Sequence, residues 1–396
     1  MQVMTENKVI PKLRFSEFNE EWEIIRLQDL AIRITEKNRD NKIQTVLTNS
    51  ATKGIVSQAD YFDRDIANKN NLDGYYIVNI GDYVYNPRIS KFAPVGPIKK
   101  NNLVLGLMSP LYSVFRFNTS EDEFFENYFE TTAWHKYMKG VANYGARHDR
   151  MNISNSDFFK MPIPIPSLPE QQKIASFLSA VDEKLQQLTK KKDLLEKYKK
   201  GVMQKIFSQE LRFKDELGNN YPNWEEKRIE DLFIVTRGTV LAIPKISPHK
   251  NDECPYPVYS SQTKNNGIAG YYKDYLFEDA ITWTTDGAQA GEVNLRKGKF
   301  YCTNVCGVLK SDEGYVNLCI AEKLNRVSRR YVSYVGNPKL MNNVMAKIKI
   351  SIPSSIDEQH KIAIFLSVID KKIALVSTQI EKTKAFKKGL LQQMFV

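Results

Sequence analysis

The stretch EQQKIASFLSAVDEK at residues 170–184 returns as EQHKIAIFLSVIDKK at residues 358–372. Ten of the fifteen positions are identical, and the second copy lies 188 residues after the first. The offset holds further along the chain, where YKKGVMQKIF (198–207) matches FKKGLLQQMF (386–395) without a gap. Internal repeats show how a chain is assembled. A segment duplicated at constant length indicates a rigid element whose length matters.

Both copies are predicted to form long helices. Starting at Ile174 and at Ile362, ten positions alternate steps of four and three residues, and eight of the ten are apolar in each copy. This spacing is typical of the seam of a coiled coil. A lone helix would expose its seam to water, so each copy is expected to pair with the other. Pro169 and Asp357 precede the repeated Glu-Gln pair, which places negative charge at the positive end of a helix.

The regions before the two repeats match at their beginnings and then diverge. LRFSEFNEEWEIIRLQDL (13–30) matches LRFKDELGNNYPNWEEKRIEDL (211–232), with Trp22 corresponding to Trp224. Both regions mix aromatic and β-branched strands with turns and short helical stretches, which indicates an α+β fold. We therefore predict a tandem duplication in four parts: a first globular domain at 1–165, a central helical spacer at 166–209, a second globular domain at 210–353 and a C-terminal helical spacer at 354–396.

Composition and charge narrow the class of protein. The 396 residues are 42% hydrophobic and 26% charged, which is ordinary for a folded domain, and no apolar run is long enough to cross a membrane. Without a signal peptide, the chain is expected to be cytoplasmic and its four cysteines reduced. The net charge of +11 predicts a polyanionic partner, and each repeat carries +4 of it. The alternative is that these lysines only solvate the exposed faces of helices.

Three further phrases accompany the paired EQ-x-KIA-x-FL-x-x-x-D motifs: GARHDRMNIS (145–154), TTDGAQAGEV (284–293) and CTNVCGVL (302–309). Together they resemble the DNA-specificity subunit of type I restriction–modification systems, over essentially the whole chain. The second junction departs slightly from the first, with Asp357 in place of Pro169 and His360 in place of Gln172.

The resemblance implies two target-recognition domains joined by two long antiparallel coiled-coil helices, in a pseudo-twofold molecule. Each domain would read one half of an asymmetric bipartite site in double-stranded DNA. Two modification subunits would dock on this frame and methylate adenine with S-adenosylmethionine, and restriction subunits with ATP and Mg²⁺ would translocate and cleave. This subunit itself would hold no cofactor and would not be an enzyme.

The residues themselves agree with a subunit that performs no chemistry. The Asn-Pro-Pro-aromatic motif of adenine methyltransferases is missing, since residues 86–88 and 337–339 read only NPR and NPK. No G-x-x-x-x-G-K-[ST] phosphate loop occurs, and the four histidines are scattered. Two alternatives stay open at this point: a coiled-coil scaffold that joins proteins, and a nuclease or methyltransferase with an unfamiliar site.

In the first half, base reading is expected from two loops rich in forked and cationic side chains. Arg88, Arg147 and Arg150 are candidates for guanine, and His148 or Lys91 for phosphate. The alternative is that these arginines pair with Asp149 or solvate the surface. The full set of candidates is Tyr85, Asn86, Arg88, Lys91, Tyr144, Arg147, His148 and Arg150.

In the second half, YSSQTKNNG (259–267) gathers polar side chains on a predicted loop. Gln262 or Asn265 is expected to bind adenine through its amide, and Lys264 to contact a phosphate. The following stretch adds polar residues beside Trp283, which is predicted to lie in the core rather than to stack on a base. The full set of candidates is Ser260, Ser261, Gln262, Thr263, Lys264, Asn265, Thr284, Asp286, Gln289 and Arg296, the last as a phosphate contact or an ordinary surface charge.

Overall fold

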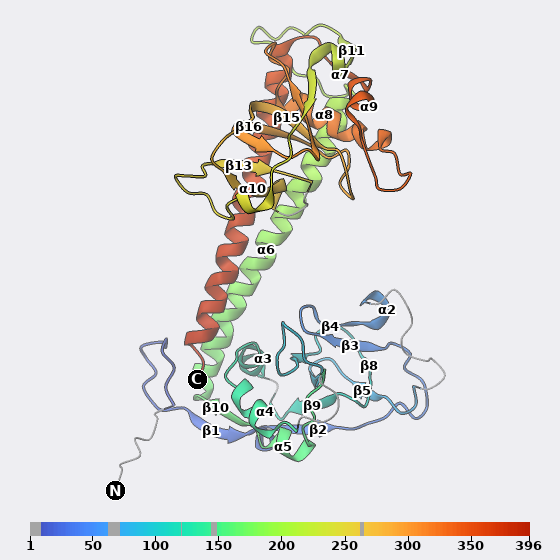
Figure 1. Cartoon of the computed structure of the whole chain (residues 1–396). Coiled ribbons are helices and arrows are strands. Elements are labelled where there is room, and N and C mark those ends of the chain that lie inside the picture. The colour runs from blue at the N-terminus through green and yellow to red at the C-terminus, as the bar shows by residue number, and fades with distance from the viewer. Residues whose placement is uncertain (1–8, 62–71, 120, 144–148, 262–264) are drawn as a thin grey trace. The chain divides into compact units, whose positions relative to one another are not determined.

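The computed structural model describes residues 9–61, 72–119, 121–143, 149–261 and 265–396. The chain forms two compact units, one of residues 1–189 with 379–396 and the other of residues 190–378. Each unit contains an α+β globular domain and parts of two long helices (Figure 1). The unit boundaries cut through both helices, so each half of a helix packs with one domain. Among the described residues, no helix has the length and apolarity needed to cross a membrane.

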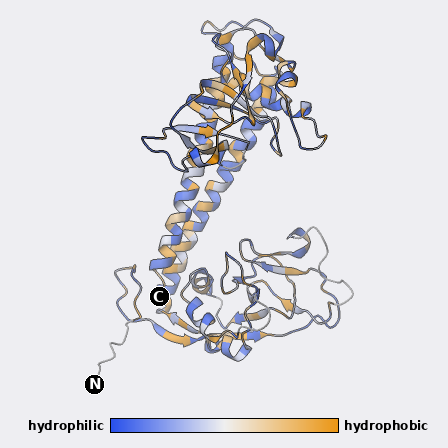
Figure 2. Ribbon diagram, in the orientation of Figure 1, coloured by the Kyte–Doolittle hydropathy of each residue, from blue (hydrophilic) through white to orange (hydrophobic). Residues whose placement is uncertain are grey.

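The two repeats form the long helices α6 (Leu168–Phe207) and α10 (Ile356–Gln393), as the sequence predicts. Within the first unit, Asp182 of α6 pairs with Lys387 of α10, and Leu178 shares a core with Leu391. From the first contact to the second, the residue number falls along α6 and rises along α10, so the two helices run antiparallel in this unit. The second unit repeats this arrangement, with a 2.8 Å pair between Lys199 and Asp370. Figure 2 shows hydrophobic and hydrophilic residues alternating along both helices, as paired amphipathic helices require.

The first domain is built from antiparallel strands in short sheets. Its central sheet has the order β2 (Ala31–Ile34), β9 (Ser113–Phe117), β6 (Tyr83–Tyr85), β7 (Ile98–Lys100). Three two-stranded sheets surround it: β1 (Glu23–Arg26) with β10 (Pro162–Ile165), β3 (Leu47–Ser50) with β4 (Gly54–Ser57), and β5 (Tyr76–Val78) with β8 (Gly106–Met108). The helices are α1 (Leu27–Leu30), α2 (Gln58–Tyr61), α3 (Glu123–Phe129), α4 (His135–Val141) and α5 (Asn155–Phe159).

An aromatic core joins this domain to its share of the long helices. Phe117 stacks on Phe125 with ring centroids 4.0 Å apart, and Tyr83 packs edge-on against Phe117. Phe395, which lies just after the end of α10, contacts both Phe124 and Trp22 of the domain. Buried aromatic pairs of this kind contribute about 0.5–1.5 kcal/mol each beyond their buried area. The helices are therefore part of the hydrophobic core of the unit.

The second domain has a different sheet. Six strands lie in the order β12 (Ile234–Arg237), β17 (Cys306–Lys310), β15 (Phe277–Thr284), β16 (Val293–Cys302), β13 (Tyr256–Tyr259), β14 (Ile268–Tyr272), and the β13–β16 pair is parallel. A separate pair joins β11 (Trp224–Arg228) to β18 (Lys349–Pro353). The remaining elements are α7 (Ile229–Leu232), α8 (Leu318–Ser328), α9 (Asn342–Ala346), and the short turns η1 (Ile243–Lys245), η2 (Asn265–Gly267) and η3 (Arg329–Tyr331). Trp283 lies in the core, as predicted, where its indole N–H donates to the carbonyl of Leu340 at 3.0 Å.

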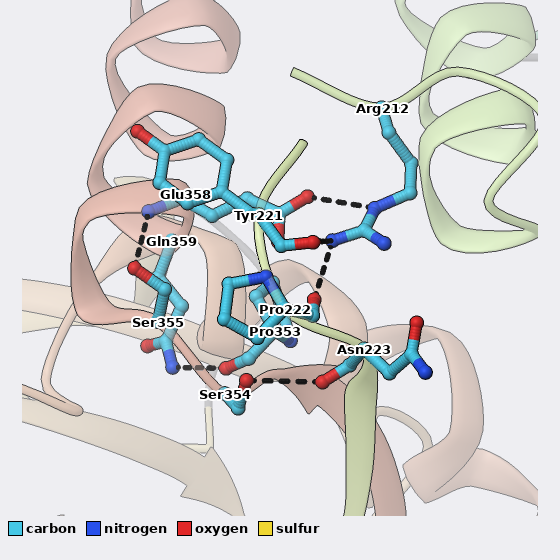
Figure 3. Close-up of polar contacts among 9 residues, drawn as sticks. All are labelled: Arg212, Tyr221, Pro222, Asn223, Pro353, Ser354, Ser355, Glu358 and Gln359. Atoms are coloured by element: carbon cyan, nitrogen blue, oxygen red, sulfur yellow. Dashed lines mark hydrogen bonds and ion pairs between the residues drawn. The ribbon is translucent and has the colours of Figure 1, made fainter. Parts of the chain in front are cut away.

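The repeated Glu-Gln pair anchors the start of each long helix. In the second unit, the Arg212 guanidinium donates to both carboxylate oxygens of Glu358, at 3.1 and 2.8 Å (Figure 3). In the first unit, Arg14 makes the same two bonds to Glu170, at 2.8 and 2.7 Å. The following glutamine then donates to a carbonyl of the segment before its helix, Pro166 in one unit and Pro353 in the other. In each unit, the glutamate thus forms a buried ion pair and also places a negative charge at the start of the helix.

A second repeated contact ties each domain to both helices. Lys387 of α10 binds Asp182 of α6 at 2.8 Å and Glu130, which follows α3, at 2.9 Å. In the other unit, Lys199 of α6 binds Asp370 of α10 at 2.8 Å and Glu322 of α8 at 2.7 Å. Burial alone lowers the pKa of each lysine, but the paired carboxylates outweigh it and raise the pKa. We call these two sites the lysine clamps.

Candidate nucleic-acid interface

The structure brings together two segments of the first domain that the sequence singles out. The backbone of Arg88, after β6, forms a β-bridge with Arg150. The Ile89 amide donates to the Asp149 carbonyl at 3.0 Å, and the Met151 amide donates to the Pro87 carbonyl at 2.9 Å. Two loops about 60 residues apart in sequence therefore present their arginines on one surface.

Both arginines lie near Asp149, as the alternative interpretation expects, but neither is firmly held by it. The Nε atoms of Arg88 and Arg150 are 3.7 and 4.0 Å from the same Asp149 oxygen. These distances exceed a normal hydrogen bond, and the two arginine side chains are 67% and 31% exposed. Exposed pairs of this kind contribute about 0–1 kcal/mol. The guanidinium groups therefore stay available for an anionic or base ligand.

Tyr85 and Asn86 have other roles than the predicted contact with DNA. Tyr85 is buried, its ring stacks on Phe158 at 5.0 Å, and its hydroxyl donates to the Val95 carbonyl. Because this side chain is buried and its hydroxyl is bonded within the domain, the prediction that Tyr85 contacts DNA is wrong. The Asn86 amide donates to the Asn49 carbonyl at 2.9 Å and accepts from the Arg88 amide at 3.0 Å. Asn86 therefore positions the Arg88 loop.

Tyr144, Arg147 and His148 lie outside the described residues, as do Gln262, Thr263 and Lys264. Lys91 is exposed and remains a predicted phosphate contact.

A cavity of about 520 Å³ opens beside Arg88 and Arg150. Its walls come from β3, α2 and the loop after β6, and its lining combines polar side chains with a larger apolar surface. Sequence reasoning missed the contributions from β3 and α2, because neither segment carries a charged or glycine-rich signature. The polar lining residues that were not sequence candidates, from these two elements and from neighbouring loops, are Thr48, Asn49, Ser50, Gln58, Tyr61, Tyr75, Ser90, Ser109 and Tyr112.

In the second domain, the predicted loop is closed at its base. The Ser260 amide donates to the Gly267 carbonyl at 2.9 Å, and the Thr303 hydroxyl donates to the Ser260 hydroxyl at 3.3 Å. Ser261 is half-buried, whereas Asn265 is exposed and adopts a left-handed conformation with φ of 52°. Asparagine tolerates this backbone region better than most residues. The prediction that Asn265 binds adenine therefore stands as a prediction.

The polar residues after β15 are engaged within the domain. Asp286 accepts from the Thr285 hydroxyl at 2.6 Å and lies 3.8 Å from the ammonium of Lys339. Gln289 accepts from the Arg329 guanidinium at 2.9 Å, and Thr284 is half-buried at the end of its strand. Arg329 is exposed and was not among the sequence candidates. The bonds of Asp286 and Gln289 must be exchanged before either side chain binds DNA, and the contact of Thr284 with DNA stays a prediction.

Arg296 is a clear correction. It is only 6% exposed, its guanidinium carbon lies 3.8 Å from the centre of the Tyr259 ring, and its Nε donates to the Thr282 hydroxyl at 3.2 Å. Burial lowers the pKa of this guanidinium, although Tyr259 opposes the change. Because the charge is held inside the domain by a cation–π contact, Arg296 does not present it to DNA phosphates.

Metal-ligating residue types are scattered among the described residues. The described residues contain no group of three or more His, Cys, Asp or Glu side chains placed to hold a metal ion. Burial raises the pKa of Cys306 and of Cys319 to about 12, so neither thiol is a nucleophile near neutral pH. The exposed Arg88 and the half-buried Arg150 instead place guanidinium groups beside a cavity, which suits recognition.

Comparison with known proteins decides the family. The model of the type I restriction modification DNA specificity domain matches residues 19–197 and again residues 221–385. The chain belongs to this family. The two matches fall on the two predicted halves, so the tandem duplication is confirmed as two specificity domains in one chain.

Relatives of this family cover parts or all of the chain. The N-terminal part of a type I specificity subunit of Mycoplasma pneumoniae is 43% identical over 143 residues, which is 35% of this chain and 74% of that protein. A type I restriction enzyme specificity subunit of Methanocaldococcus jannaschii is 25% identical over 414 residues, covering 96% of this chain and 94% of that one.

Solved structures agree on the fold. The crystal structure of the S subunit of a type I restriction–modification system from M. genitalium superposes with a TM-score of 0.63 at 16% identity, over 98% of this chain and 99% of that one. The predicted α+β fold with two domains and two long helices is therefore confirmed.

Proposed function

We propose that this chain is the DNA-specificity subunit of a type I restriction–modification complex and that each unit reads one half of an asymmetric bipartite site. One observation carries the proposal: a repeated frame supports two different domains. The buried arginine–glutamate anchors and the lysine clamps recur in both units, whereas the central sheets differ in strand number and order. Identical frames with different sheets suit two readers of different DNA sequences. A scaffold that only joins proteins would not require this divergence.

The proposal assigns chemistry to partner subunits. Two modification subunits would methylate adenine with S-adenosylmethionine, and restriction subunits with ATP and Mg²⁺ would cleave, all directed by this non-catalytic chain in the cytoplasm. Support comes from the sequence, which lacks the Asn-Pro-Pro-aromatic motif of adenine methyltransferases. The exposed Arg88 and the half-buried Arg150 beside the cavity add support for contact with DNA.

The outer face of α10 supports the docking of a partner helix. Ile364, Val368 and Leu375 are exposed, and their spacing of four and seven residues places them on one side of the helix. The buried residues Ile362 and Leu366 lie on the opposite side, towards α6. An exposed apolar stripe along a helix is typical of a surface that packs against another helix. We assign this stripe to the modification subunit.

Charging this stripe should prevent assembly. The double substitution Ile364→Asp and Leu375→Asp is expected to reduce co-purification of the modification subunit at least tenfold, because two carboxylates would have to be buried against the partner helix. The fold should survive, since both side chains are about two-thirds exposed, at 64% and 60%. Ala374→Asp, at an exposed position outside the stripe, is the matched control. Equal retention of the partner by the double variant and the control would contradict the assignment.

The central test is methylome sequencing after co-expression with the modification subunit. We expect methylated adenines within one bipartite motif that depends on this chain. Replacing Gln262, Lys264 and Asn265 by alanine should weaken recognition in one half of that motif only, because a bidentate base contact contributes about 1–3 kcal/mol of discrimination. Equal loss of specificity in both halves, or an unchanged motif, would contradict the role of this loop. Methylation without any bipartite motif would contradict the proposed function itself.

A further inference from the structure

Three side-chain amides line the cavity of the first domain, and two of them are already committed to the fold. The Asn49 amide nitrogen donates to the carbonyls of Val84 and Pro97, at 2.7 and 3.1 Å. Asn86 is bonded through both ends of its amide, to Asn49 and to Arg88. Both asparagines therefore build the wall of the cavity.

Gln58 is the third amide, and its side chain makes no hydrogen bond to any other described residue. Its backbone is fixed, since its amide N–H donates to the Val46 carbonyl at 2.8 Å. The side chain is half-buried and lines the same cavity as Arg88 and Arg150. A positioned backbone with an uncommitted amide is the arrangement that a recognition residue needs.

The short helix that carries Gln58 is attached to the neighbouring hairpin. The Ser50 hydroxyl of β3 donates to the Tyr61 hydroxyl of α2 at 3.1 Å, and the Lys53 ammonium lies 5.4 Å from the centre of the Tyr61 ring. The Thr48 and Tyr112 hydroxyls are likewise paired with each other, at 3.2 Å. These hydroxyl groups thus hold the walls of the cavity. The buried Asn49 Oδ1 also has no partner, and the Gln58 amide and the two arginines have donors free for a ligand.

The chemistry of these free groups matches the edge of a base pair beside phosphates. A glutamine amide offers one donor and one acceptor in a plane, which is the complement of N6 and N7 of adenine in the major groove. Arginines at the rim supply phosphate contacts that fix the register of the DNA. We infer that Gln58 is a specificity-determining residue that reads an adenine in the half-site recognised by the first unit. This inference rests on the proposed function and names one reading residue within it.

The test uses the full chain co-expressed with its modification subunit and compares methylomes. Gln58→Ala is expected to reduce discrimination at one adenine position by about 5- to 150-fold, the range of a bidentate base contact. Gln58→Glu is expected to shift that position from adenine towards cytosine, because a carboxylate only accepts and the N4 amino group of cytosine donates. Gln44→Ala is the matched control, since Gln44 is exposed in the same domain and its amide is bonded to the Asn41 carbonyl.

The outcomes separate this inference from the function on which it rests. The variant with alanine at Gln262, Lys264 and Asn265 is expected to alter one half-site. A change confined to the other half-site supports the role of Gln58. An unchanged bipartite motif in both Gln58 variants overturns the inference and leaves the proposed function standing. If the wild-type chain directs no bipartite methylation, the proposed function fails. If Gln58→Ala abolishes all methylation, the nearly isosteric Gln58→Glu provides the test. A motif identical to that of the wild type in this second variant would overturn the role of Gln58.

Discussion

Replacing Arg212 by alanine is expected to destabilise the second unit by about 3–5 kcal/mol, the cost of leaving one member of a buried ion pair alone. The Glu358 carboxylate is completely buried, and Arg212 holds both of its oxygens. Arg212 also donates to the carbonyls of Tyr221 and Pro222, which would lose this donor (Figure 3). Chemical denaturation of the purified chain, followed by tryptophan fluorescence, measures the change. The equivalent variant Arg14→Ala should have a similar effect in the first unit, where Glu170 is also buried.

A control and a second variant make this prediction specific. Arg228→Ala removes an exposed ion pair with Glu230, whose N–O distance is 3.3 Å, and should cost less than about 1 kcal/mol. Adding Glu358→Gln to Arg212→Ala should restore part of the stability, because the buried charge is then removed together with its partner. If Arg212→Ala costs no more than Arg228→Ala, the anchor does not hold the start of α10.

The two long helices were predictable from the sequence because their apolar spacing extends over many residues and occurs in both repeats. The seam starting at Ile174 recurs at Ile362, so chance periodicity is a poor explanation, and the two copies do form α6 and α10. The buried anchors were not predictable. Glu358 and Arg212 are 146 residues apart, and nothing near either residue indicates that the pair is buried. From the sequence alone, Glu358 is expected to be a solvated charge at the start of a helix.

The candidate site was only partly predictable, because residue type does not reveal burial in short strands. All three residues of β6 are buried, so no alternation showed that Tyr85 points into the core. Arg296 lies in a strand whose ends are buried and whose middle is exposed, and its cation–π contact with Tyr259 depends on a pairing of distant strands. Gln58 was missed because the four-residue helix that carries it has no periodic pattern. Arg88 and Arg150 were candidates because loop arginines are conspicuous in sequence, and their contact with DNA stays a prediction.

Lengthening the helices is expected to change the DNA spacing that the complex recognises without changing the half-site sequences. Helix α6 is continuous over 40 residues, which is about 60 Å at ~1.5 Å per residue. Four added residues lengthen a helix by about 6 Å and rotate it by about 40° beyond one full turn. DNA rises ~3.4 Å per base pair, so the gap between the half-sites should grow by at most about 2 base pairs. The reading residues lie in the domains and are untouched.

The lysine clamps determine how the insertion must be made. Lys387 and Asp182 fix the pairing of α6 with α10 in one unit, and Lys199 and Asp370 fix it in the other. Four residues added to α6 alone, after Thr189, leave α10 too short to satisfy both clamps, so one of them must shift by a helical turn. The same four residues added also after Thr378 lengthen both helices at the unit boundaries and preserve both clamps.

Two variants therefore give a matched comparison. The paired insertion should retain wild-type stability and direct methylation to a motif with unchanged halves and a longer gap, with the original sites unmethylated. The α6-only insertion should lengthen the gap as well but lower the midpoint of thermal unfolding, since one clamp and the seam beside it are displaced. Methylome sequencing and thermal denaturation measure the two effects. An unaltered gap in the paired variant would show that helix length does not set the spacing, and altered half-sites would show that the helices also shape the reading surfaces.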